Sequence, residues 1–356
     1  MDVQSFLIYT GLLIFTFLMA ELATKANKVI FAWLIIIVLS LVSGLRANSV
    51  GIDTKTYFSI FNKISNKQMD LVYGVEESFM HICYFLLKIW NDERFLFFLY
   101  AFIAHALIIF RLWEAREYSS FPWCVLCYYI TLYGFSLNVL RQFVAIAIIF
   151  FGSRYLVNGR YFKFLIFVLI ASAFHISSVI CFLFIPIEIL FFKRLDKKKR
   201  MGLTIILLMS IIAFFGLFDL LVNKYISYFN TRVSNIGFML PFKLLFVFST
   251  AFVFKSNQNN YLGKLDGYRY IVKSSRIYYI LGISLTFLSY FFAYAGRIGA
   301  YFYIFEVIYI GMLCNLKNYG KVFKLCSVFL LGYIFYKGIM SGSNGEIPYL
   351  FFWQAK

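Results

Sequence analysis

Long apolar runs recur along almost the whole chain, and they constrain its fold more than any other feature of the sequence. The runs are about 17–22 residues long, and a helix of that length crosses a hydrocarbon core of roughly 30 Å. Of the 356 residues, 62% are hydrophobic, 22% are aromatic and only 14% are charged. A soluble domain of this size does not have this composition. We therefore expect an all-α polytopic membrane protein, with residues 1–356 in a single integral membrane domain.

The apolar runs predict about twelve transmembrane helices. The expected spans are 5–23, 29–45, 95–112, 121–137, 141–157, 163–174, 176–192, 201–222, 239–254, 276–294, 298–315 and 322–339. A shorter run at 77–90 begins beside Glu76 and Glu77, so we expect an interfacial or re-entrant helix there. This short amphipathic helix would belong to an external loop, residues 46–94. The first run lacks a basic stretch ahead of it, which favours a retained span over a signal peptide.

The basic residues indicate the orientation of the chain in the membrane. The formal net charge is +18, and the densest basic run is KRLDKKKR, from Lys193 to Arg200. Lys and Arg gather in cytoplasmic loops, and their distribution favours both termini on the outer side. The charge therefore describes topology rather than a ligand. Since the sequence also carries no nucleic-acid-binding motif, we expect no nucleic-acid partner.

Residues 163–192 allow two interpretations. They could form one helix with His175 near its middle, or a hairpin whose first arm ends before His175. A single helix would put the basic run that begins at Lys193 on the side opposite to the basic loop between Arg154 and Lys163, against the positive-inside rule. The hairpin obeys the rule, although its first arm is short. It would place His175 at the floor of a protein-lined cavity that opens to the outside.

Four ionisable residues fall at the predicted outward ends of widely separated spans. They are Arg46, Arg141, His175 and Arg297. A single arginine at a helix end often only extends its charge to the lipid headgroups, and a single histidine can be structural. Several arginines and one histidine on the same side favour a functional site, because ionisable groups are costly at membrane depth.

The remaining histidines and the cysteines favour structural roles. His105 lies in the middle of a span and His81 on the short helix. Neither falls at an outward helix end together with the arginines. The six cysteines lie in or beside apolar segments, and the CxxC of Cys124 and Cys127 has no thioredoxin-like context. The sequence offers no compact cluster of carboxylates or histidines, so we expect no metal and no cofactor.

Arginines beside a histidine fit glycosyl transfer from a diphosphate-linked donor. Cleavage of the bond between the anomeric carbon and the phosphate leaves negative charge on the diphosphate, which arginine forks bind with bidentate geometry. The acceptor hydroxyl must lose a proton, and a histidine can accept it. Gly51 would let the chain turn so that Asp53 and Thr54 face the same cleft as Arg46, although a G-x-D-T stretch can also be an ordinary turn.

The sequence resembles the EpsG family of bacterial polysaccharide polymerases, the group that includes Wzy-type O-antigen polymerases. The stretches that carry this resemblance are GLRANSVGIDTKTY, EESF, FSLNVLRQFVAIAI, LIASAFHISSVI, GRIGAYF and IPYLFFW, in that order along nearly the whole chain. The most specific are N-x-x-R-Q, which begins at Asn138, and A-x-x-F-H-x-S, which ends at Ser177. Where the family usually has Glu-Pro, this chain has Glu76-Glu77.

The resemblance implies a metal-independent, GT-C-like membrane glycosyltransferase in the bacterial inner membrane. It would join oligosaccharide repeat units linked to undecaprenyl diphosphate at the periplasmic face, for O-antigen, capsule or exopolysaccharide. Its partners would be the lipid-linked donor and acceptor, membrane lipid and a chain-length regulator. A lipid-linked glycan flippase and an O-antigen ligase are the alternatives, and a membrane acyltransferase is a more distant one. A flippase would need two related halves, and we find no internal repeat.

Residue roles also follow from the resemblance. The catalytic residues would be His175, Arg141 and Arg297, with the arginines on the diphosphate and the histidine near the reacting hydroxyl. The residues that bind substrate would be Arg46, Asp53, Thr54, Glu76, Asn138 and Tyr349. A carboxylate, Asp53 or Glu76, could serve as the base instead of His175.

Overall fold

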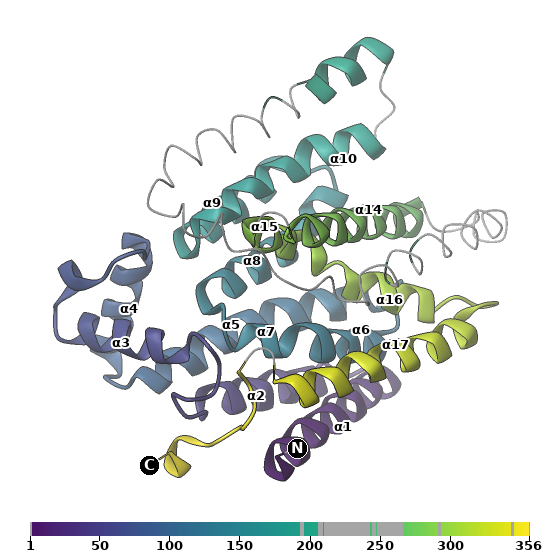
Figure 1. Cartoon of the computed structure of the whole chain (residues 1–356). Helices are drawn as coiled ribbons and strands as arrows, with labels where there is room; N and C mark the ends of the chain where they lie inside the picture. Colours follow the sequence, from purple (N-terminus) through teal and green to yellow (C-terminus); the bar gives the residue numbers. More distant parts are fainter. Residues whose placement is uncertain are drawn as a thin grey trace. The chain divides into compact units, whose positions relative to one another are not determined.

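The computed structural model describes residues 2–192, 196–205, 209, 243, 247, 266–290, 293–342 and 345–355. Within these residues every regular element is a helix, and one isolated bridge joins Arg46 to Phe351 (Figure 1). The longer helices are α1 (Val3–Ala26), α2 (Ile30–Gly44), α3 (Thr54–Ser65), α4 (Glu77–Ile89), α5 (Glu93–Glu114), α6 (Phe121–Tyr128), α8 (Leu140–Val157), α9 (Tyr161–Phe174), α10 (Phe184–Phe192), α14 (Asp266–Leu288), α15 (Ala293–Tyr303), α16 (Glu306–Cys314) and α17 (Gly320–Ser341). Short pieces extend some of them: η1 (Met69–Leu71), η2 (Ala115–Glu117), the π-helical η3 (Tyr129–Tyr133), α7 (Gly134–Ser136), η4 (Ile176–Leu183) and η6 (Phe352–Gln354).

Several of these helices have the length and composition of membrane spans. Four are long and apolar enough to cross a bilayer, namely Val3–Ala26, Glu93–Glu117, Tyr294–Cys314 and Gly320–Ser341. Three shorter apolar helices are Ile30–Gly44, Tyr161–Phe174 and Ile176–Phe191. The exposed side chains of α1 support this assignment, because they are apolar and recur on one stripe at Val3, Leu7, Ile14, Leu18 and Leu22. These helices indicate a membrane protein, as the sequence predicts.

Most of the predicted spans that fall on described residues coincide with helices, with two differences, and two other predicted spans stay untested. The predicted spans 201–222 and 239–254 lie almost wholly outside the described residues. Helix α14 ends at Leu288, six positions before the end that the sequence predicts at 294, and begins earlier, at Asp266. Helix α3 has no counterpart in the prediction, because a search for long apolar runs passes over an amphipathic helix of 12 residues.

The described chain divides into two compact units. The first comprises Met1–Phe151, Ile170–Ile176 and Val307–Lys356, and the second comprises Gly152–Leu169 and Ser177–Glu306. The prediction of one integral membrane domain stays a prediction, as does the external position of residues 46–94. That segment contains α3 and α4, so it holds two helices where the sequence predicts one.

The first unit packs α1, α2, α5 and α6 against one another. Helices α2 and α5 come into backbone contact at Gly44, where a Cβ atom would lie 2.7 Å from the Cβ atom of Phe98. Helices α3 and α4 pack beside α5 through an aromatic cluster formed by Phe61, Phe79 and Phe97. The ring centroid of Phe61 lies 6.4 Å from that of Phe79 and 5.4 Å from that of Phe97.

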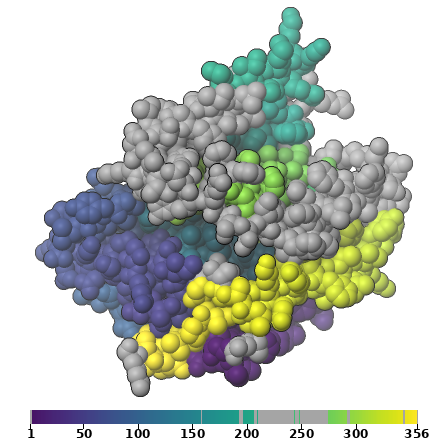
Figure 2. Space-filling view, in the orientation of Figure 1, coloured from purple at the N-terminus to yellow at the C-terminus, as the bar shows by residue number. Residues whose placement is uncertain are grey.

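The C-terminal segment of the first unit pairs with the chain that follows α2. The Ala47 N–H donates to Leu350 O at 2.8 Å, the Phe352 N–H to Leu45 O at 2.9 Å, and the Gly51 N–H to the carbonyl of Gly345 at 2.7 Å. In Figure 2 this C-terminal part, in yellow, lies beside the purple surface of the N-terminal residues. The loop that carries Arg46 is therefore fixed by residues about three hundred positions away in sequence.

The second unit contains a helical hairpin. The rings of Phe164 in α9 and Phe184 in α10 have centroids 5.9 Å apart, whereas a continuous helix would separate residues twenty positions apart by about 30 Å. Phe184 also stacks on Phe302 of α15, with centroids 4.5 Å apart and an interplanar angle of 7°. This contact confirms the hairpin interpretation of residues 163–192 and contradicts the single helix.

Candidate functional site

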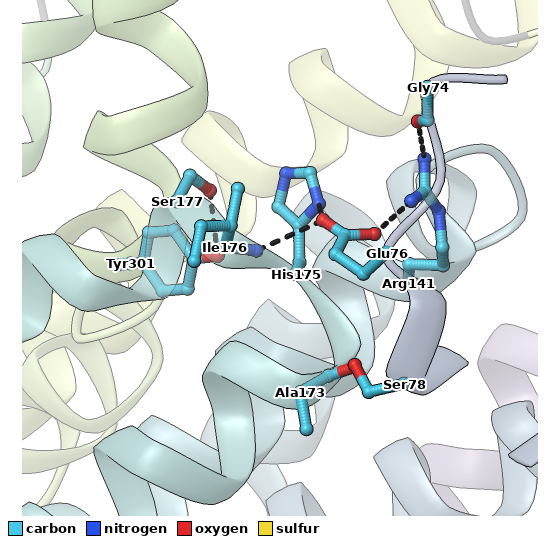
Figure 3. Close-up of polar contacts among 9 residues, drawn as sticks. All are labelled: Gly74, Glu76, Ser78, Arg141, Ala173, His175, Ile176, Ser177 and Tyr301. Atoms are coloured by element: carbon cyan, nitrogen blue, oxygen red, sulfur yellow. Dashed lines mark hydrogen bonds and ion pairs between the residues drawn. The ribbon is translucent and has the colours of Figure 1, made fainter. Parts of the chain in front are cut away.

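A glutamate, an arginine and a histidine meet in the first unit, and Glu76 joins the other two (Figure 3). Glu76 precedes the first residue of α4 and has an extended backbone. Its Oε2 accepts a hydrogen bond from the Arg141 guanidinium. Its Oε1 lies 3.1 Å from Nδ1 of His175 and accepts the Ile176 N–H at 3.0 Å. The side chains of Glu76, Arg141 and His175 are only 17%, 15% and 15% exposed.

His175 lies at the break between α9 and η4. Helix α9 ends at Phe174 and η4 begins at Ile176, so the last carbonyl groups of α9 and the first N–H groups of η4 have no partners within their own helices. The first turn of α4 satisfies one group on each side of the break. The Ser78 hydroxyl donates to Ala173 O at 2.6 Å, and Glu76 accepts the Ile176 N–H. The short EESF stretch thus holds the backbone on both sides of His175.

Arg141, the second residue of α8, brings a positive charge to this cluster. In addition to Glu76, its guanidinium donates to Gly74 O at 3.3 Å, and its charge acts on the Tyr57 side chain. The guanidinium carbon lies 5.5 Å from the ring centroid of Phe79. Among the described residues, its buried Nε–H has no hydrogen-bond partner. The Nε–H of the guanidinium is therefore available to donate a hydrogen bond to a ligand.

The surroundings of Glu76 keep its carboxyl group ionised. Burial raises the pKa of this group, but the hydrogen bond with His175, the charge of Arg141 and the Ile176 N–H together lower it to about 2. An ionised carboxylate accepts hydrogen bonds and donates none, so the proton between Glu76 and His175 sits on Nδ1. The second ring nitrogen, Nε2, makes no hydrogen bond with any described residue. Nε2 is then the free basic position of the cluster.

Arg46 lies deep in the first unit and is only 2% exposed. Its guanidinium donates to Ser43 O and to Leu137 O, the latter at 3.0 Å, and its Nε lies 3.4 Å from the Thr54 hydroxyl oxygen. The guanidinium carbon stacks on Phe97, 4.5 Å from the ring centroid. These contacts tie the end of α2 to α3 and to the residues before α8. Arg46 would have to break them to contact a substrate, so its predicted role in substrate binding stays a prediction.

The turn after Arg46 has the conformation that the sequence predicts at Gly51. This glycine has φ of +93°, and an added Cβ atom would lie 2.6 Å from the Thr54 hydroxyl oxygen. Asn138 fixes the same turn, since its Oδ1 accepts the Ile52 N–H at 2.6 Å. Thr54 donates to Val50 O at 2.6 Å and is buried. Thr54 and Asn138 thus stabilise the loop around Arg46.

Three further residues that the sequence predicts for the site lie on segments other than those of Glu76, Arg141 and His175. Asp53 directly precedes α3, although its side chain does not cap that helix. Tyr349 is fully buried, and its hydroxyl donates to Val42 O at 2.6 Å while its N–H donates to the Ser5 hydroxyl oxygen. Arg297 is exposed on α15 of the second unit, one turn before the buried Tyr301, whose hydroxyl lies 3.1 Å from that of Ser177.

Of the predicted site residues, the structure thus brings together Glu76, Arg141 and His175. Glu76 belongs to the cluster, whereas the adjacent Glu77 is exposed. Ser78 and Tyr57 could not be singled out from the sequence, because the Ser78 contact with Ala173 and the nearness of Tyr57 to the Arg141 charge depend on the docking of α3 and α4. Among the described residues, no group of three potential metal ligands occurs.

Comparison with known proteins agrees with the resemblance seen in the sequence. The model of the EpsG family matches residues 29–351. This range includes Glu76, Arg141 and His175, which together form the Glu76 cluster. No curated protein and no solved structure matches the chain significantly. EpsG is a family of Wzy-like polymerases, with a polysaccharide polymerase-like role. Because the match spans nearly the whole chain, this protein belongs to the EpsG family.

Proposed function

We propose that this protein is a polysaccharide polymerase that joins oligosaccharide repeat units linked to undecaprenyl diphosphate. In this proposal it is a multi-pass protein of the bacterial inner membrane and acts at the periplasmic face. Its donor and acceptor are both lipid-linked glycans, and a chain-length regulator is a partner. The family supports the polymerase-like role, and the Glu76 cluster supports the chemistry.

The observation that carries the proposal is the pairing of His175 with an ionised carboxylate. The distance of 3.1 Å between Nδ1 and Glu76 Oε1 fixes the imidazole orientation and its tautomer. Nε2 then takes the proton of the attacking acceptor hydroxyl, and the hydroxyl oxygen forms a bond with the anomeric carbon of the donor. The bond from that carbon to the phosphate oxygen breaks, and the lipid diphosphate leaves with the electron pair.

In this mechanism an arginine stabilises the negative charge of the leaving group, the lipid diphosphate. Negative charge develops on the diphosphate as the glycosidic bond breaks, and a planar guanidinium binds phosphate oxygens with two parallel hydrogen bonds. Arg141 lies beside His175 through their shared contact with Glu76, so one cluster would serve both the acceptor proton and the leaving group. Arg297 is a second candidate for the diphosphate.

The surface glycans of a deletion strain test the reaction class. Loss of a polymerase leaves a single repeat unit attached to its carrier or acceptor, which a gel resolves from the ladder of the parent strain. Loss of a flippase would leave no repeat unit on the surface. Loss of a ligase would leave polymer on the lipid carrier and none on the lipid A core. Only the first result agrees with the proposal, and expression of the intact chain must restore the ladder.

A further inference from the structure

The Arg141 guanidinium is an anion-binding position that already holds an anion, the Glu76 carboxylate. Glu76 contacts it through one oxygen, Oε2, because the other oxygen is committed to His175 and to the Ile176 N–H. The buried Nε–H of Arg141 has no partner among the described residues. The pair is therefore monodentate, although an arginine and an oxyanion can form two parallel hydrogen bonds.

We propose that the diphosphate group of the lipid-linked donor displaces Glu76 from Arg141, and that this exchange prepares His175 for proton transfer. A diphosphate offers several oxygens, so it can engage both arms of the guanidinium, including the donor that Glu76 leaves unpaired. Displacement is local, since Oε1 keeps its contacts with His175 and Ile176 while Oε2 is released. The inference rests on the proposed function, and it adds a competition between two anions for one arginine.

The exchange has a consequence for the base. While Arg141 is bound to Glu76, its positive charge offsets the negative charge of that carboxylate. After the diphosphate has taken over Arg141, the carboxylate is free to stabilise the imidazolium that forms when Nε2 receives the acceptor proton. The imidazolium would thus receive this stabilisation only when a donor is present.

Binding measurements on the full-length protein in detergent test the competition. The probes are farnesyl diphosphate, which carries a prenyl chain, and inorganic pyrophosphate, which carries none. The variants Glu76→Gln and Glu76→Ala both remove the carboxylate that contacts Arg141. If one of them fails to fold, binding can still be measured on the other. We expect farnesyl diphosphate to bind both variants roughly tenfold more tightly than the intact protein, because no carboxylate competes.

Two controls accompany these variants. Ser78→Ala loosens the same turn of α4 without touching Arg141, so its affinity should equal that of the intact protein. Arg141→Ala should lose binding of the probe. If Ser78→Ala binds as tightly as Glu76→Gln, the gain comes from a loosened turn and the competition is contradicted.

The remaining outcomes separate this inference from the proposed function. Unchanged affinity in both Glu76 variants, with binding lost in Arg141→Ala, would overturn the competition and leave Arg141 as the donor contact. Unchanged affinity in Arg141→Ala would overturn both. Equal affinity of the intact protein for the two probes would contradict a lipid-linked ligand, whereas tighter binding of farnesyl diphosphate supports one.

Discussion

Glu76 Oε1 lies 3.1 Å from His175 Nδ1, although 99 positions separate the two residues in the chain. The same carboxylate also binds Arg141, which comes from a third helix. A single acidic side chain thus links the break between α9 and η4, the start of α4 and the start of α8. Its removal should affect the orientation of the histidine more than the fold of any of these helices.

Glu76→Gln tests this link. The glutamine has the same shape but carries no charge, so it cannot stabilise an imidazolium. We expect polymerisation in purified protein to fall by roughly tenfold or more, with protein yield unchanged. Glu77→Gln is the matched control, because Glu77 is the exposed neighbour in the same turn. Equal activity of the two variants would contradict a positioning role for Glu76.

Arg141→Lys tests the guanidinium. Lysine keeps the positive charge but cannot contact Glu76, the Gly74 carbonyl and a phosphate group with one planar fork. We expect most of the long polymer to disappear from a gel of surface glycans. Arg116→Lys is the control, since Arg116 donates to Trp113 O and stacks on that ring, away from the cluster. Equal polymer in the two strains would mean that only a positive charge is needed at position 141.

Arg46→Ala tests whether that arginine belongs to the scaffold. Its loss leaves the buried carbonyls of Ser43 and Leu137 without a donor, at about 1–3 kcal/mol for each unsatisfied group. We expect a lower melting temperature in detergent and a reduced yield. Arg94→Ala removes an arginine whose side chain is 38% exposed, and it should melt close to the intact protein. An Arg46→Ala protein with unchanged melting but no activity would instead support direct contact with substrate.

The pH dependence of stability follows from the pKa of Glu76. Because the folded protein lowers this pKa from 4.5 to about 2, the interactions of the carboxylate stabilise the fold above pH 4.5. That stabilisation is lost as the pH falls through 4.5 toward 2. The difference in melting temperature between the intact protein and Glu76→Gln should therefore not shrink between pH 8 and pH 5, and it should shrink below about pH 4.5. A difference that already shrinks between pH 7 and pH 5 would contradict an ionised, hydrogen-bonded Glu76.

The sequence predicts the helices that are long and apolar, and it predicts the break at His175. The long apolar helices follow from the length of the apolar runs, and the positive-inside rule favours a break at His175 over a single helix. Helix α3 escapes prediction because its apolar residues cover one face only. The count of twelve spans and the orientation of the chain stay predictions.

The candidate site is harder to predict because it depends on contacts between distant segments. The residue types in the N-x-x-R-Q and A-x-x-F-H-x-S stretches single out Arg141 and His175. The contacts of Glu76 with Arg141 and His175 depend on the docking of α4 on the break, to which the Ser78 contact with Ala173 contributes. The burial of Arg46 likewise depends on the pairing of residues 345–352 with the chain after α2.

Polymerisation by His175→Ala in purified protein, with a lipid-linked repeat unit as the substrate, tests the proposed mechanism most directly. If Nε2 takes the acceptor proton, the rate should fall by roughly 10²-fold or more, while yield and melting temperature stay unchanged. His105→Ala is the control, because His105 is fully buried against the Tyr128 hydroxyl, 2.6 Å from Nδ1, and should keep its activity if it melts normally. A stable His175→Ala protein that polymerises at the rate of the intact chain would contradict the assignment of His175 as the base.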